Sequence, residues 1–98
     1  MSKTNSAAIK SAAAHLAAQG KCLRTADTRV WICDVIDALL SQNPGWTEAQ
    51  IKYAMRTTER EVMYATGDLL GAYDAAKLAR SRTRIDSYRD DAVFVVVL

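Results

Sequence analysis

The stretch Ala92-Val93-Phe94-Val95-Val96-Val97-Leu98 is the clearest structural signal in this sequence of 98 residues. β-Branched and aromatic residues dominate it, so we expect a β-strand over 92–98. A strand with one face in water alternates apolar and polar residues, whereas this stretch is apolar on both faces. Helices together with a neighbouring chain, or a sheet continued across a dimer, would cover both faces. The stretch therefore predicts a homodimer to which the last strand or the first helix contributes.

The residues before this strand predict its partner. Over 77–86 the side chains alternate, so that Arg80, Arg82 and Arg84 fall on one face of an extended chain. The polar cluster 87–91 is typical of a turn. We therefore expect an antiparallel hairpin of strands 77–86 and 92–98, with a row of positive charge on its first strand.

A helix start signal lies further upstream. Thr47 and Gln50 are spaced as a capping box, which predicts a helix that begins at Glu48. Trp46 and Ile51 are spaced as the hydrophobic staple that often accompanies such a box. The start of this helix is therefore well marked.

The end of the same helix has two interpretations. Apolar residues recur at spacings of three and four as far as Ala76, which allows one helix over 48–80. Against this, Thr57-Thr58 is a β-branched pair that opens a second capping box, and a glycine inside a helix costs about 1 kcal/mol. Two glycines, Gly67 and Gly71, fall in this segment. We favour two helices, 48–55 and 59–70, with a turn at 56–58; the single long helix is the alternative.

The N-terminal half predicts two more helices. The first covers about 5–19 and ends at Gly20, and the second covers 27–41 and ends at Asn43-Pro44-Gly45. The predicted fold is a single domain over 1–98, mainly α with a C-terminal β-hairpin. Residues 1–20 form a helical addition to a core of residues 28–98.

Composition narrows the classes of function. The formal net charge of +2 neither requires nor excludes a nucleic-acid partner. Cys22 and Cys33 are expected to be reduced, and His15 is the only histidine, so we expect no zinc site and no cofactor. No nucleophile stands beside a base, which argues against an enzyme. The apolar segment Ala12–Ala18 is too short for a membrane span or a signal peptide, so we expect a cytoplasmic protein without a membrane partner.

The order of predicted elements resembles the winged helix-turn-helix DNA-binding domains. The resemblance runs from about Trp31 to Leu98 and consists of a helix, the 48–55 and 59–70 helix pair, and the basic hairpin. It implies a small regulator that binds double-stranded DNA. The 59–70 helix would lie in the major groove, and the hairpin would touch the flanking backbone or minor groove.

The resemblance also implies which residues contact DNA. Arg60 would reach a guanine edge or a phosphate, the threonines would meet phosphate at a helix N-terminus, and the hairpin cations would add salt-dependent affinity. The full set is Arg56, Thr57, Thr58, Arg60, Tyr64, Lys77, Arg80, Arg82 and Arg84. Two observations weigh against it. Arginines on an edge strand also prevent aggregation, and Glu59, Glu61 and Asp68 place negative charge on the predicted recognition helix.

Two other functions stay open. One is a small inhibitor or adaptor, of the kind carried by phages or mobile elements, that docks on a larger protein complex; it fits the single long helix better. The other is a structural subunit of an oligomer. Whether the helix breaks at Thr57-Thr58 is the structural observation that bears on this choice.

Overall fold

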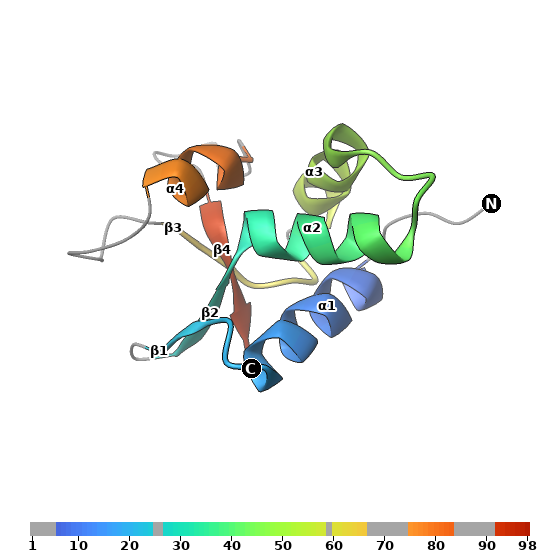
Figure 1. The fold of residues 1–98 in the computed structure, drawn as a ribbon. Coiled ribbons are helices and arrows are strands. Elements are labelled where there is room, and N and C mark those ends of the chain that lie inside the picture. The colour runs from blue at the N-terminus through green and yellow to red at the C-terminus, as the bar shows by residue number, and fades with distance from the viewer. Residues whose placement is uncertain (1–5, 25–26, 59, 67–74, 84–91) are drawn as a thin grey trace.

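The structure, a computed structural model, describes residues 6–24, 27–58, 60–66, 75–83 and 92–98. Four helices and four strands lie in these segments (Figure 1). In chain order they are α1 (Ser6–Ala18), β1 (Leu23–Arg24), β2 (Thr28–Trp31), α2 (Ile32–Gln42), α3 (Glu48–Thr57), β3 (Tyr64–Thr66), α4 (Ala75–Ser81) and β4 (Ala92–Val97). The fold is therefore mixed α/β, and the described segments contain four strands where the sequence predicts two.

The strands form one antiparallel sheet with the order β1-β2-β4-β3. The predicted C-terminal strand is confirmed as β4, and it lies inside the sheet. Val95 pairs with Val30 of β2 on one side and with Tyr64 of β3 on the other. Residues 92–96 are buried, so a single chain covers both faces of this apolar strand.

Each face of the sheet contributes to a different apolar cluster. Val30 and Val95 join the main core, together with buried residues of α1, α2 and α3. Trp31 and Phe94 point the opposite way, as strand alternation requires, and their rings lie 4.4 Å apart between centroids. Leu78 of α4 packs against this second cluster. α4 thus covers the part of the sheet where β2 passes into α2 (Figure 1).

The helix predicted over 27–41 is wrong in its first turn. Residues 28–31 form β2, and α2 begins at Ile32. Their β-branched and aromatic side chains suit a strand, and β4 offers them a partner in register. α2 has no side-chain cap of its own at Trp31; instead the Cys33 N–H donates to Ser81 Oγ at 3.0 Å. A residue of α4 therefore satisfies an amide in the first turn of α2.

The helix predicted over 59–70 is also wrong in the part that can be compared. The chain makes a single turn, in which the amides of Glu61 and Val62 donate to the Thr58 carbonyl at 2.9 and 3.1 Å, and then extends into β3. Pairing with β4 and burial of Val62 outweigh the local capping signal. The single helix over 48–80 is excluded for the same reason. Residues 59 and 67–70 of the prediction lie outside the described segments.

The strand predicted over 77–86 is wrong at its start. Residues 75–81 form helix α4, so this segment is no partner of β4; residues 84–86 lie outside the described segments. The alternation of side chains over 77–86 suggested a strand, but Ala, Lys, Leu and Arg are also strong helix formers. Two other predictions are confirmed: α1 fits the 5–19 prediction, with Gly20 at a φ of 81°, and α3 begins at Glu48.

Candidate nucleic-acid interface

α3 has three faces with different roles. Ile51, Ala54 and Met55 are buried in the core. The capping box is complete, with Gln50 N–H donating to Thr47 Oγ1 at 3.2 Å and Thr47 N–H donating to Gln50 Oε1 at 3.0 Å. Because the box fixes the N-terminus, the remaining two faces of the helix are held in defined directions. One of them points toward α4 and the other into solvent.

The face toward α4 is polar and consists of Glu48, Lys52 and Arg56, which are spaced four residues apart. Glu48 Oε1 accepts from Arg80 Nη2 at 3.1 Å, and Lys52 Nζ donates to the Arg80 carbonyl at 2.8 Å. One turn later, Arg56 Nη1 donates to the Thr83 carbonyl at 2.9 Å. Residues 80–83 therefore run along α3 and are held by its charged side chains.

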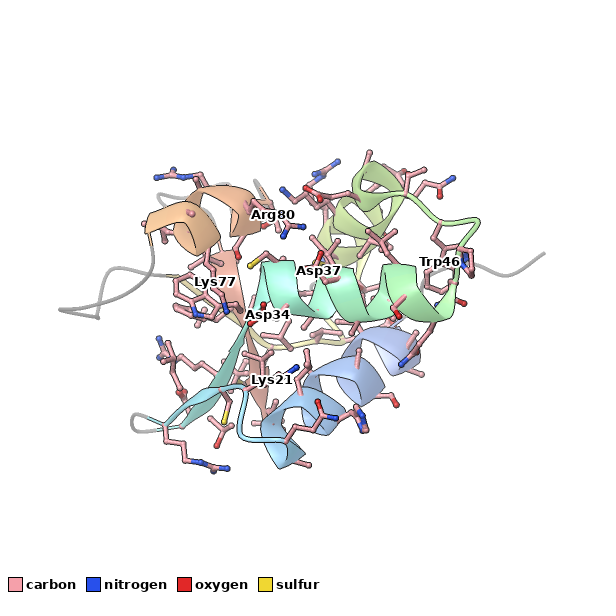
Figure 2. All side chains as sticks on the ribbon, in the orientation of Figure 1. Lys21, Asp34, Asp37, Trp46, Lys77 and Arg80 are labelled. Carbon is pink, nitrogen blue, oxygen red and sulfur yellow. The ribbon has the colours of Figure 1, made fainter. Side chains whose placement is uncertain are left out.

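α4 is joined to α2 by two ion pairs (Figure 2). Lys77 Nζ lies 3.1 Å from Asp34 Oδ2. The two terminal nitrogens of Arg80 lie 3.2 and 3.0 Å from the two carboxylate oxygens of Asp37. The hydrogen bonds to Asp37 make the largest contribution to raising the pKa of the Arg80 guanidinium above its ordinary value, and the hydrogen bond to Glu48 makes the next largest. Arg80 is therefore a fixed positive charge with two carboxylate partners.

The segment after the ion pairs is anchored by buried hydroxyls. Ser81 is buried and accepts the Cys33 amide, while Thr83 is buried and donates from Oγ1 to the Ala92 carbonyl at 3.1 Å. A buried polar group that loses its partner costs about 1–3 kcal/mol, so both contacts hold the backbone firmly. These two buried contacts thus hold residues 81–83 in addition to the hydrogen bonds from Lys52 and Arg56.

The structure brings together only part of the predicted DNA-contacting set. Arg56, Lys77 and Arg80 meet around α3 and α4, and Arg82 is exposed just beyond them. Arg60 is exposed after the end of α3. Arg84 lies outside the described segments.

The other predicted contacts lie elsewhere than expected. Thr57 and Thr58 lie at the C-terminal end of α3, and their hydroxyls donate to the Ala54 carbonyl at 3.0 and 2.7 Å. They are therefore not at the helix N-terminus where a phosphate would meet backbone amides. Tyr64 lies in β3 and packs against the main core, so it is not on an outward helix face.

Sequence reasoning missed the residue that stands out most on α3. Tyr53 is 62% exposed, and the Arg56 guanidinium carbon lies 5.8 Å from the centre of its ring. The signal was present, because residues three apart on a capped helix share a face. Asp37 was also missed as the partner of Arg80, and no local spacing could have revealed a pair 43 residues apart.

The remaining surface features give little indication of a catalytic or metal site in the described segments. A hollow of about 430 Å³ beside the Lys77–Asp34 pair is lined by Trp31, Cys22 and Lys21, among others. Within the described segments no three His, Cys, Asp or Glu side chains gather where they could hold a metal ion. None of the helices described is long and apolar enough to cross a membrane. No protein-family model, curated protein or solved structure matches the chain.

Proposed function

We propose that the chain binds double-stranded DNA as a winged helix-turn-helix module in which α3, and not 59–70, is the recognition helix. Support comes from the arrangement of elements. α2 and α3 are consecutive helices, and the antiparallel strands β3 and β4 follow them. The resemblance rests on a helix pair followed by a strand pair. In the structure this helix pair is α2 and α3, so the second helix begins about ten residues earlier in the chain than predicted. The wing would be the connection between β3 and β4, to which α4 belongs.

The observation that carries the proposal is the solvent face of α3. Tyr53 lies on it, Arg56 lies beside the Tyr53 ring at the border with the face toward α4, and exposed Thr57 follows. Among the described residues the hydrogen-bond partner of Arg56 is a neutral carbonyl, and no carboxylate there forms an ion pair with it. A guanidinium beside a phenol ring suits a phosphate or a base edge. Exposed Arg60 follows four residues later, and exposed Arg82 is the neighbour of Thr83, which Arg56 contacts.

Binding to a random-sequence duplex at several salt concentrations tests this proposal. Each phosphate contact contributes about 0.9 to the slope of log affinity against log salt. We expect affinity to fall steeply between about 50 and 200 mM salt. We expect Arg56→Ala to make the slope shallower by about 0.9, which corresponds to about eightfold weaker binding at about 0.1 M salt. Arg56→Lys keeps the charge and should keep most of the slope.

The matched control is Arg24→Ala. Arg24 is exposed on β1, away from α3, and its loss lowers the net charge equally. A slope that changes as much for Arg24→Ala as for Arg56→Ala would argue against a specific surface on α3. Absence of binding at low salt would remove the proposal altogether.

A second candidate function is binding to a protein. α1 and the end of β4 border a groove of about 280 Å³, lined largely by apolar side chains such as Val62, Met63 and Val97. Met63 is 52% exposed. An inhibitor or adaptor would use such a groove, and its partner would protect Met63 from oxidation, whereas DNA bound at α3 would not.

A further inference from the structure

We propose that Asp37 and Glu48 are specificity-determining residues, which hold the Arg80 side chain in an internal ion pair and withhold it from the phosphates of random duplex. This inference rests on the proposed DNA-binding function. It assigns a role to the two acids that border the α3–α4 contact, where a DNA-binding surface would be expected to have none.

Both terminal nitrogens of Arg80 have carboxylate partners. Its two terminal nitrogens lie 3.2 and 3.0 Å from the oxygens of Asp37, and one of them also lies 3.1 Å from Glu48. Lys52 Nζ adds a second cation 3.5 Å from Glu48. Two carboxylates therefore balance two cations, and this patch contributes no net positive charge toward a phosphate backbone.

Arg56 and Arg80 differ in the charge of the groups to which they donate hydrogen bonds. Arg56 donates to the neutral Thr83 carbonyl, so it attracts phosphate in the free protein. Arg80 can attract phosphate only after it leaves two carboxylates, and those carboxylates would then repel the same phosphate. Arg80 should thus add little to binding on random DNA, although it lies beside α3.

The exchange itself is feasible because only a side chain has to move. The side chains of Arg80, Asp37 and Glu48 are 45%, 57% and 41% exposed, and ion pairs this exposed add little to stability. The backbone next to Arg80 is fixed separately, since Ser81 and Thr83 are buried and hydrogen-bonded to α2 and β4. If a DNA site places a phosphate within reach, the Arg80 side chain could therefore leave Asp37 and Glu48 and bind that phosphate without displacing α4.

The test is the affinity of the double variant Asp37→Asn with Glu48→Gln for a random-sequence duplex. One additional phosphate contact should raise affinity about eightfold at about 0.1 M salt and steepen the salt slope by about 0.9. In an Arg80→Ala background the same two changes should give a much smaller gain, because the released guanidinium is absent. Circular dichroism and urea unfolding establish that each variant is folded.

Asp27→Asn is the control for charge alone. It removes a carboxylate from an arginine, since Asp27 lies 2.7 Å from Arg29, and it adds one positive unit where the double variant adds two. A general effect of charge would therefore give this control about half of the double variant's gain in log affinity. Its effect on affinity should be small. The inference is overturned if wild type binds with a normal salt slope and the double variant binds no better. It is equally overturned if the gain persists without Arg80.

The two proposals fail in different ways. If neither wild type nor the double variant binds duplex at low salt, the proposed function is removed and this inference with it. If wild type binds and the acids make no difference, DNA binding stands and only the role of Asp37 and Glu48 is lost. If only the double variant binds, the wild-type chain lacks the proposed function, and this inference falls with it.

Discussion

At the scale of single residues, the stability of the fold depends strongly on Phe94. Its side chain is fully buried on the central strand and packs against Trp31. We expect Phe94→Ala to lower the free energy of unfolding by about 3–5 kcal/mol, because it removes an aromatic ring from a packed cluster. Urea unfolding measures this. Tyr53→Ala, at an exposed aromatic residue, should cost less than about 1 kcal/mol, and equal losses would contradict the packing described.

Ser81 is a second residue with a measurable role. Its hydroxyl accepts the Cys33 amide inside the molecule, and alanine would leave that amide without this acceptor. We expect Ser81→Ala to cost about 1–3 kcal/mol in urea unfolding. Ser11→Ala, at an exposed position of α1, is the matched control and should change stability by less than about 0.5 kcal/mol. If the two variants unfold alike, Ser81 does not cap α2.

The same scale shows where sequence reasoning reached its limit at the candidate site. Arg56 and Arg80 could be selected from the sequence as basic residues. Their partners could not, because Thr83 and Asp37 are 27 and 43 residues away in the chain. Whether a cation is available to DNA depends on these distant partners. The sequence therefore identified the basic residues but not whether each of them is paired within the protein.

At the scale of elements, α3 is the clearest case of a local signal that decides structure. Both hydrogen bonds of its capping box are present. We expect Thr47→Ala to cost about 1 kcal/mol, since it removes the acceptor for an N-terminal amide. Urea unfolding tests this, with Thr57→Ala at the other end of the helix as control. A larger loss for Thr57→Ala than for Thr47→Ala would contradict the importance of the box.

Elements with strong local signals were predictable, and elements that depend on pairing were not. α1, the start of α3 and β4 follow from caps, glycine and β-branched residues. β2 and β3 exist because β4 pairs with both of them, and that pairing spans more than 60 and about 30 residues of chain, respectively. α4 reversed a strand prediction because Leu78 could pack against Trp31 and Phe94, a cluster that the sequence does not reveal.

At the scale of the whole molecule, the position of β4 changes the reason for expecting a dimer. The strand is apolar on both faces, as the sequence indicated, but helices and strands of the same chain bury it. A partner copy is therefore not needed to cover residues 92–96. The homodimer stays a prediction without this support, and sedimentation at micromolar concentration is its direct test.

The central claim is that DNA binds at α3 and the residues beside it. The most direct measurement is a titration of isotope-labelled protein with a random-sequence duplex, followed by amide chemical shifts. We expect the largest shifts at Tyr53, Arg56 and Thr57, with further shifts around Arg82, and little change along α1. Shifts centred on the groove between α1 and β4, or no shifts at low salt, would contradict the claim.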